Sequence, residues 1–385
     1  MDYLLTEEQQ MIQDLCRQIA EEKIRPVAAE LDEKEQFPYE IMKVISESDL
    51  FGVYLPAEYG GTGGGVLELC IATEEFSKAC GGIAVCYAAS ALGTIPILLF
   101  GNEEQKKKYL PVLASGKSLA AFGLTEPEAG SDASAVSTTA KKEGDCYILN
   151  GTKHFITNGG VADIYTIVAM TDKTKGARGA SCFIVEKDTP GFTIGQKEKK
   201  MGIRASVTSE LIFNDCKIPK ENLLGKEGMG FIVTMKTFDM SRPGVAAQAV
   251  GIAQGALDLA VAYAKERKQF GKSISSFQGI QFMIADMATQ IEAARALVYA
   301  TARMVDAGKP KVGKSSAMAK LFASEVAMSV TTDAVQIFGG YGYMRDYPIE
   351  KYMRDAKITQ IYEGTSQIQR NIIGLETIKE TVKKK

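Results

Sequence analysis

The stretch Ile361-Tyr362-Glu363-Gly364-Thr365-Ser366-Gln367-Ile368-Gln369-Arg370 lies near the C-terminus and joins an acidic residue to the start of a predicted helix. Ser366 and Gln369 have the spacing of an N-terminal capping box, and the isoleucines that follow recur at helical intervals. We therefore expect Glu363 to be held in a turn just before a helix. Gly364 would let the backbone pass close to a ligand at this turn.

This stretch alone allows two interpretations of the role of Glu363. Apolar neighbours raise the pKa of a carboxyl group by desolvation, so Glu363 is a candidate general base. The alternative is an acidic residue that is favoured before a helix by the helix dipole. The rest of the chain has to decide between them.

Length and composition limit the class of protein. A chain of 385 residues suits two or three subdomains, and 45% hydrophobic residues are ordinary for a globular protein. The net charge of −2 argues against a nucleic-acid-binding surface. The longest apolar runs reach about half the length of a membrane-spanning helix, so no membrane partner is expected. The start, Met1–Glu8, lacks the pattern of a signal peptide, which predicts a cytoplasmic location.

Cysteine and histidine usage restricts the chemistry. The seven cysteines form no Cys-x-x-Cys pair and their number is odd, which predicts buried free thiols in a reducing compartment. His154 is the only histidine, so we predict no metal site. A nucleophile of the Ser-His-Asp or Cys-His type would have to use His154. The acid–base chemistry of an enzyme with this composition must come mostly from carboxylates or from a cofactor.

Periodicity divides the chain into three parts and predicts an α+β fold. Residues 1–120 read as an N-terminal helical domain, in which Thr6 and Gln9 form a capping-box pattern before a helix at Glu7–Glu22. Residues 121–225 read as a β-barrel or sandwich, with Asn150-Gly151 predicting a hairpin turn. Residues 226–385 read as a four-helix bundle, with an apolar stripe along Phe277–Val298.

A glycine-rich run invites a phosphate-loop interpretation. Tyr59-Gly60-Gly61-Thr62-Gly63-Gly64-Gly65 lacks the glycine spacing of a dinucleotide fingerprint and the Gly-Lys-Ser/Thr ending of a P-loop, and no clear strand precedes it. We therefore predict a turn at this run.

Four further stretches combine polar groups with turn residues: Leu124–Asp132, Phe155–Gly159, Arg267–Gly271 and Gln336–Gly342. Each stretch alone is typical of a turn or a helix cap. Together with Glu363 they form a specific set that runs the length of the chain.

This set resembles the acyl-CoA dehydrogenase family of flavoenzymes. The motifs that carry the resemblance are Leu124–Asp132, Arg267–Gly271, Gln336–Gly342 and Ile361–Gln367, in the family's order and spacing. The resemblance covers essentially the whole chain, and the short-chain, butyryl-CoA dehydrogenase-like branch is the most similar.

The resemblance implies FAD-dependent α,β-dehydrogenation of a short-chain, branched or cyclic acyl-CoA to a trans-2-enoyl-CoA. Glu363 matches the base that removes a proton from the carbon next to the thioester, while the neighbouring carbon gives a hydride to flavin N5. The Glu363 backbone N–H and a ribityl hydroxyl of FAD would bind the thioester oxygen. Electrons would pass to electron-transferring flavoprotein, and the protein would be a homotetramer.

The resemblance also implies contacts at other positions. Flavin-ring and ribityl contacts are implied for Phe122, Leu124, Thr125, Gly130, Ser131, Phe155, Ile156 and Thr157. Contacts with the diphosphate and adenine end, partly across a subunit interface, are implied for Arg267, Phe270, Gln278, Gln336, Ile337, Phe338, Gly339 and Gly340. The remaining FAD contacts match Thr365, Ser366 and Gln367. Substrate contacts match Ser131, Asp239, Arg242 and Gly364.

Two positions separate branches of the family. Some branches place the base on the helix around Asp239–Arg242, where this chain has Ser241, which cannot act as that base. Tyr87 stands on a helix that lines the acyl pocket in relatives, so it is either core packing or a determinant of a branched, cyclic or carboxylated acyl group. Rival functions are an enoyl-CoA reductase that runs the reaction in reverse, an acyl-CoA oxidase, and a family-like binding protein without chemistry.

Overall fold

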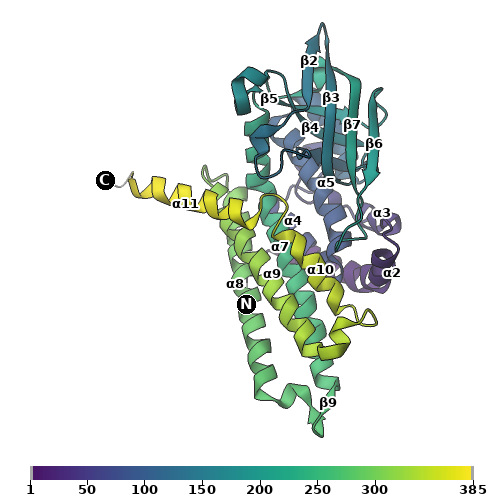
Figure 1. The fold of residues 1–385 in the computed structure, drawn as a ribbon, viewed down its shortest axis with the longest axis vertical. Helices are drawn as coiled ribbons and strands as arrows, with labels where there is room; N and C mark the ends of the chain where they lie inside the picture. Colours follow the sequence, from purple (N-terminus) through teal and green to yellow (C-terminus); the bar gives the residue numbers. More distant parts are fainter. Residues whose placement is uncertain (1–2, 383–385) are drawn as a thin grey trace.

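The computed structural model describes residues 3–382; Met1, Asp2 and the basic tail Lys383–Lys385 lie outside them. Helices come first, strands follow and helices return, with the sheet at one end of the long axis and the helical bundle at the other (Figure 1). This arrangement confirms the predicted α+β fold. The division into domains at residues 120 and 225 stays a prediction, although α6 ends at Ala114 and α7 begins at Gly230.

The N-terminal part consists of α1 (Glu7–Ile19), α2 (Ala28–Glu33), α3 (Tyr39–Glu47), α4 (Val66–Ala79), α5 (Gly81–Phe100) and α6 (Glu103–Ala114). The capping box before α1 is confirmed, because Thr6 Oγ1 accepts from Gln9 N at 3.2 Å and Gln9 Oε1 accepts from Thr6 N at 3.1 Å. A π-helical turn, Ala20–Ile24, continues α1 through the predicted end of the helix.

The glycine-rich run ends at the start of α4. Val66 N and Leu67 N donate to the two carboxylate oxygens of Asp306, at 2.6 and 3.1 Å. A side chain of this protein thus already occupies the N-terminal amides of the helix that would have to bind a phosphate. This occupation agrees with the prediction that the run is a turn.

The sheet contains β1 (Ala120–Gly123), β2 (Thr139–Glu143), β3 (Cys146–Thr157), β4 (Ile164–Met170), β5 (Ala180–Glu186), β6 (Phe192–Lys197), β7 (Thr208–Pro219) and β8 (Leu223–Leu224). The hydrogen-bonded order is β6-β7-β3-β2-β4-β5-β8, with β1 parallel to β4. The interior faces of these strands and the N-terminal helices share one hydrophobic core.

The predicted hairpin at Asn150-Gly151 is wrong. β3 runs straight through these residues with a register shift against β7, and Asn150 exchanges hydrogen bonds with Asp215 on that strand. The two-residue turn lies instead at Gly144-Asp145, where Glu143 of β2 pairs with Cys146 of β3. Gly144 has a φ of 61°, which favours glycine, so the Gly-Asp dipeptide carried the turn signal.

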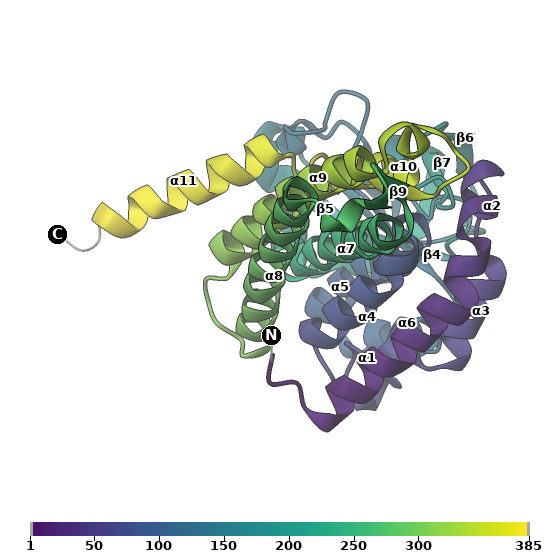
Figure 2. The ribbon, with the colours of Figure 1, turned by 90° about the horizontal axis from the view of Figure 1, so that it is seen from below.

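The C-terminal part contains α7 (Gly230–Glu266), the short strands β9 (Lys268–Gln269) and β10 (Lys272–Ser273), α8 (Gln278–Asp306), α9 (Gly313–Phe338), α10 (Ile349–Thr359) and α11 (Ser366–Val382). Helices α7 to α10 enclose a second hydrophobic core. Helix α11 extends away from the rest of the molecule, as both ribbon views show (Figures 1 and 2).

Two helices, α5 and α7, are long and apolar enough to cross a membrane by length and composition alone. The most apolar window of each is 72% buried inside the protein. Their apolar surface is therefore used in the two cores. Helices that are hydrophobic on all sides belong in such positions.

Helix α4 connects the two cores. Its residues Leu69, Ala72 and Phe76 face the core shared with the sheet, whereas Val66, Leu67, Cys70 and Ile71 face the core of the bundle. The helix also carries two acidic residues, Glu74 and Glu75, that are each only 1% exposed. Burying a charge is costly unless it is paired, so these two residues need partners.

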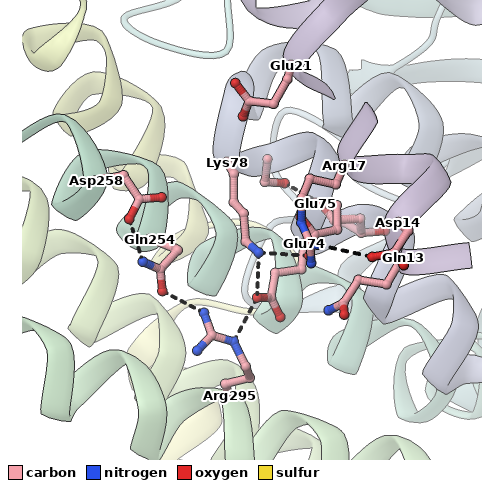
Figure 3. A network of polar contacts seen from close by, with 12 residues as sticks. Gln13, Asp14, Arg17, Glu21, Glu74, Glu75, Lys78, Gln254, Asp258 and Arg295 are labelled. Carbon is pink, nitrogen blue, oxygen red and sulfur yellow. Dashed lines mark hydrogen bonds and ion pairs between the residues drawn. The ribbon is translucent and has the colours of Figure 1, made fainter. Parts of the chain in front are cut away.

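The partners come from α8, from α1 and from α4 itself, and a residue of α7 holds the α8 partner in turn (Figure 3). Arg295 of α8 donates from Nε to Glu74 at 2.8 Å and from a terminal nitrogen to Gln254 of α7 at 2.8 Å. Lys78 donates to Glu75 at 2.8 Å, and Arg17 of α1 lies 3.4 Å from the same carboxylate. The network therefore ties the N-terminal helices to the C-terminal bundle.

Removing Arg295 should destabilise the protein strongly. Arg295→Met leaves Glu74 buried without its main partner, and the loss of one partner of a buried pair costs about 3–5 kcal/mol. Arg345→Met is a matched control, because its ion pair with Glu33 is exposed, and such a pair is worth about 1 kcal/mol or less. Denaturant unfolding of both variants measures the difference. Equal losses would contradict an interdomain role for the network.

Candidate active site

A cavity of about 130 Å³ lies where the three parts of the chain meet. Helices α4 and α5 supply its apolar wall, the ends of β1 and β3 supply a second wall, and α7 supplies a third. Glu363 and Tyr362 close it from the turn before α11. The lining residues are Leu69, Val85, Ala88, Ala89, Ala91, Leu92, Ile95, Phe122, Leu124, Thr125, Phe155, Ile156, Thr157, Phe238, Ser241, Gly244, Val245, Gln248, Tyr362 and Glu363.

Glu363 stands in a left-handed turn between α10 and α11, as predicted. Its φ is 48° and that of Gly364 is 93°. The φ of Gly364 favours glycine, and a Cβ atom there would lie 2.7 Å from Gln369 Nε2 and displace that amide. Gln369 Nε2 donates to the carbonyl oxygens of both turn residues at 3.0 Å. The turn is thus held from the first turn of the following helix.

The capping box predicted for Ser366 and Gln369 is wrong. Thr365 Oγ1 accepts from Ile368 N at 3.3 Å, while Ser366 Oγ donates to Glu325 of α9 at 2.8 Å. The Gln369 side chain does not bond to the helix start, because it donates to the carbonyl oxygens of the left-handed turn. The spacing signal marked the start of the helix but assigned the cap to the wrong residue.

The carboxylate of Glu363 points at α7. Ser241 Oγ donates to Glu363 Oε2 at 2.7 Å, and Arg242 Nε donates to the Glu363 carbonyl oxygen at 3.2 Å. Burial raises the pKa of Glu363, although the Ser241 hydrogen bond and the charges of Arg242 and Lys320 lower it in part. A carboxyl group in this balance is a stronger base than an exposed one and can still ionise.

The backbone N–H of Glu363 is free. No hydrogen bond within the described part of the chain uses it as a donor. A free N–H beside a carboxylate at a cavity wall can receive an oxygen atom of a ligand.

The wall opposite Glu363 is held by a buried ion pair. Lys153, which is fully buried, donates to Glu126 Oε1 at 2.7 Å and to the Leu124 carbonyl oxygen at 3.0 Å. Glu126 also accepts from Ser137 N and Oγ at 2.6 Å and from Thr138 N at 3.0 Å. Burial alone would raise the pKa of Glu126, but Lys153 and these hydrogen bonds outweigh it and lower the pKa to about 2. The pair therefore fixes the segment that contains Leu124 and Thr125.

Phe155 is an exposed aromatic residue at the end of β3. It is 60% exposed and has a φ of 57°, at a register shift between β3 and β7. Its ring packs edge-on against His154, with 3.9 Å between ring centroids. An aromatic side chain held open at a cavity rim suits a flat ligand.

His154 also belongs to a group of residues whose ligand atoms lie within reach of one metal ion, together with Glu198 and Glu210. Glu198 lies 3.2 Å from His154 Nε2, and Glu210 lies 3.2 Å from Nδ1. Because the two carboxylates face opposite nitrogens of the ring, a single ion cannot use both close pairs. The group holds the imidazole between two acids.

The structure divides the sequence-predicted residues into two sites. Phe122, Leu124, Thr125, Phe155, Ile156, Thr157 and Glu363 line the cavity. Arg267, Ile337, Phe338, Gly339 and Gly340 line a separate groove of about 500 Å³ at the other end of α7. Helix α7 separates Arg242 from Arg267 by about 37 Å at 1.5 Å per residue. One copy of the chain therefore cannot bring both groups to a single dinucleotide.

The remaining predicted residues lie around these two sites. Gly130, Ser131 and Gln367 are exposed, Asp239 is half-buried and pairs with Lys236 at 3.7 Å, and Arg242 is 4% exposed. Near the distal groove, Phe270 is 94% exposed, Gln278 begins α8, and Gln336 is in the last turn of α9. Arg267 lies over the Tyr341 ring, 5.3 Å from its centroid.

Tyr87 does not line the cavity. It is fully buried, donates to the Leu50 carbonyl oxygen at 2.9 Å, and packs edge-on against Phe76. Other residues of α5, such as Val85, Ala88 and Leu92, line the cavity instead. Of the two interpretations of Tyr87, core packing is the one that the structure supports.

Sequence reasoning missed several cavity residues. Gln248 accepts a short hydrogen bond from Tyr362 and donates to the Gly81 carbonyl oxygen at 3.0 Å. At the wall, Ala88 and Ala89 present only methyl groups and Gly244 presents bare backbone. The only available signal was the small size of residues on helices that were predicted to be buried.

Comparisons with known proteins agree along the whole chain. Models of the N-terminal, middle and C-terminal domains of acyl-CoA dehydrogenases match residues 6–117, 121–216 and 228–377. The short-chain-specific acyl-CoA dehydrogenase of Clostridium acetobutylicum is 54% identical over 374 residues, which cover 97% of this chain and 98% of the relative. The acryloyl-CoA reductase (NADH) of Anaerotignum propionicum is 54% identical over 381 residues, 98% of this chain and 96% of the relative.

Solved structures give the same result. Butyryl-CoA dehydrogenase from Megasphaera elsdenii has a TM-score of 0.96 and 51% identity, covering 98% of this chain and 100% of that chain. A chain from a structure described as the electron transferring flavoprotein of Acidaminococcus fermentans, in connection with flavin-based electron bifurcation, has a TM-score of 0.95 and 56% identity. That match covers 97% of this chain and 98% of the other.

Substituting Glu126 should loosen the cavity wall. Glu126→Gln keeps the size of the side chain but removes the charge that accepts from Ser137 and Thr138, and hydrogen bonds to charged groups are worth about 1.5–3 kcal/mol. We expect the amide hydrogens of Ser137 and Thr138 to exchange about tenfold faster or more at neutral pH, a factor that corresponds to the lower end of this range. Hydrogen exchange with mass spectrometry measures this rate.

The matched control is Glu186→Gln, which breaks a more exposed pair between the end of β5 and Lys108 of α6 and should leave the two amides unchanged. The pKa of Glu126 is lowered to about 2. In the wild-type protein the protection of the two amides should therefore be complete above the ordinary pKa of a glutamate, and it should be lost as the pH falls toward 2. Exchange rates that are unchanged in Glu126→Gln would contradict the role of the pair.

Proposed function

The chain belongs to the acyl-CoA dehydrogenase family, and on that basis we propose that Glu363 is the base with which it oxidises a short-chain acyl-CoA to a trans-2-enoyl-CoA. The protein is an FAD-dependent oxidoreductase of the CH–CH class. The observation that carries the role of Glu363 is its position: a carboxylate with a raised pKa stands at an apolar cavity, beside a free backbone N–H.

Two groups of Glu363 act on the substrate, the backbone N–H and the carboxylate. The Glu363 N–H receives the thioester oxygen and stabilises the charge that develops there when the neighbouring carbon loses its proton. The Glu363 carboxylate takes that proton. Ser241, which holds the carboxylate at 2.7 Å, directs it toward α7 until substrate enters. When bound, FAD supplies the hydride acceptor.

The residues at the cavity fit a flavin. Phe155 presents an exposed ring at the rim, and Thr125 and Thr157 supply hydroxyl groups beside the apolar side chains of Phe122, Leu124 and Ile156. We assign the ring end of FAD to these residues. Of the other residues predicted to contact FAD, Gly130, Ser131 and Gln367 are exposed, Thr365 is half-buried and Ser366 is buried, and we keep their contacts as proposals.

The acyl group that suits the cavity is short and uncharged. No lysine or arginine is among the residues that line it, so a terminal carboxylate would be buried without a partner. Gln248 also lines the cavity, but its amide is already engaged, because it accepts from Tyr362 and donates to the Gly81 carbonyl oxygen. We infer that butyryl-sized chains fit and that dicarboxylic chains are rejected. Asp239 and Arg242 would contact the substrate from α7.

The electron acceptor is an electron-transferring flavoprotein, as the match to a chain from such a structure supports. One site can catalyse both directions of the reaction. The likeness to an acryloyl-CoA reductase favours reduction of an enoyl-CoA as the second candidate function. The seven cysteines are all free thiols, which suits the reducing cytoplasm that we propose as the location.

We propose that the protein works as a homotetramer in which FAD sites are shared. Within one chain, Arg267 lies about 37 Å along α7 from Arg242, which contacts the Glu363 turn, so we infer that the groove at the far end serves a neighbour. Phe270, Gln278, Gln336 and the 337–340 segment would then hold the diphosphate and adenine of that neighbour's FAD. Exposed apolar residues on the bundle and on α11 are available for the interfaces: Phe282, Phe322, Leu375 and Ile378.

Replacing the base should abolish turnover and leave binding intact. Glu363→Gln keeps the size of the side chain and the backbone N–H but removes the proton acceptor, which typically contributes about 10²–10⁴-fold. The rate of flavin bleaching after anaerobic addition of butyryl-CoA measures this loss. In wild-type protein the acid limb should lie above the ordinary glutamate pKa, because burial raises that of Glu363. Bleaching of Glu363→Gln near the wild-type rate would show that another group is the base.

Sharing of the FAD site predicts complementation between two inactive variants. Glu363→Gln lacks the base, and Arg267→Met lacks the distal cation. In a mixed oligomer some sites receive an intact Glu363 from one subunit and an intact Arg267 from its neighbour. We expect co-expressed subunits to recover a substantial fraction of the wild-type turnover and to scatter light as a tetramer. Mixed oligomers without recovered activity, or an active monomer with full FAD, would contradict the proposal.

A further inference from the structure

Lys320 of α9 is a fully buried cation next to the catalytic turn. Its Nζ donates to the Gly364 carbonyl oxygen at 2.7 Å. This is the same carbonyl oxygen that accepts from Gln369 Nε2 at 3.0 Å. Lysine is almost never buried without a partner, yet none of the carboxylates near Lys320 forms an ion pair with it in the described structure.

The charges around Lys320 come from three helices and the turn. Glu363 faces it from the turn, Arg242 from α7, and Glu325 from its own helix. Arg242 in turn faces Asp239, which pairs with Lys236, and Arg370 of α11 lies 3.7 Å from Glu325. Burial lowers the pKa of Lys320 to about 8, with Glu363 acting in the opposite direction, so Lys320 is still charged at neutral pH.

We propose that Lys320 is a positioning residue of the reaction, which holds the left-handed Glu363–Gly364 turn by its carbonyl oxygen and places a fixed positive charge beside the base. The inference rests on the proposed role of Glu363.

The position of Lys320 reconciles two opposed requirements on the Glu363 carboxyl group. The base needs an apolar surrounding to become a stronger base, but the same surrounding favours its protonated, inactive form. A cation on the far side of the turn favours the ionised form without contacting the substrate. Arg242 does the same from α7, where it also donates to the Glu363 carbonyl oxygen at 3.2 Å. Two cations thus hold the two carbonyl oxygens of one turn.

The test is a titration of Glu363 in the FAD-loaded protein. Infrared spectroscopy follows the carboxyl band of Glu363, which is identified by its absence in Glu363→Gln. Lys320→Met removes the charge at nearly constant length, and an opposite charge nearby typically lowers a carboxyl pKa by about one unit or more. We expect the midpoint of the Glu363 band to rise by about one pH unit in Lys320→Met, which is a tenfold shift. The acid limb of kcat/KM should rise by the same amount.

Three further variants separate this role from a structural one. Lys320→Arg keeps the charge and should restore a midpoint near that of the wild type. Lys320→Gln keeps a donor without the charge, so it should titrate like Lys320→Met and serves in its place if the methionine variant does not fold. Lys314→Met, on the same helix, removes a surface pair with Glu380 and should change neither quantity.

The outcomes distinguish this inference from the proposed function. A midpoint and an acid limb that stay at the wild-type pH in both Lys320→Met and Lys320→Gln would overturn the role of Lys320. Glu363→Gln with wild-type bleaching would instead overturn the role of Glu363. A midpoint that rises in both uncharged variants and returns in Lys320→Arg would support the proposal.

Discussion

The site depends on one constraint: a carboxylate must remain able to ionise while it faces an apolar cavity. Under the proposed function, water cannot stabilise the charge, because the cavity would hold an acyl chain and a flavin ring. In the left-handed turn the two carbonyl oxygens accept hydrogen bonds from Arg242, Lys320 and Gln369. The Glu363 N–H has no acceptor among the described residues, so it remains available to a ligand. Arrangement of the backbone, together with the choice of the acidic residue, thus gives Glu363 the surroundings of the base that we propose.

This turn needs all three parts of the chain around it. Helices α4 and α5 and the ends of β1 and β3 form the opposite walls, and each wall is fixed by a buried charge pair of its own. Lys153 and Glu126 hold the strand side, and Arg295 and Glu74 hold α4 against the bundle. Buried pairs of this kind contribute little net stability but are costly to break. We infer that these pairs act mainly by fixing how the walls of the cavity are placed.

Much of this could be predicted from the sequence, and the failures have physical causes. The turn at Glu363 was predictable because Gly364 and the helical isoleucines are local signals. The hairpin at Asn150-Gly151 failed because tertiary pairing with β7 overrode a local turn signal. The prediction of a cap at Ser366 was wrong because Gln369 donates to the carbonyl oxygens of the preceding turn instead. The resemblance pointed to the helix that carries Tyr87, but Gln248 and Lys320 could not be found, since only contacts between distant segments give these residues their roles.

Helix α7 carries Ser241 and Arg242 near one end and leads into Arg267 at the other, in a single span of 37 residues from Gly230 to Glu266. In an α-helix each added residue turns everything beyond it by about 100° and moves it by about 1.5 Å. An insertion or deletion inside this span would therefore misalign the two ends even if the helix itself stayed intact. We expect natural relatives to tolerate substitutions along α7 but to keep its length, and to vary in length at surface turns such as Gly144-Asp145 instead.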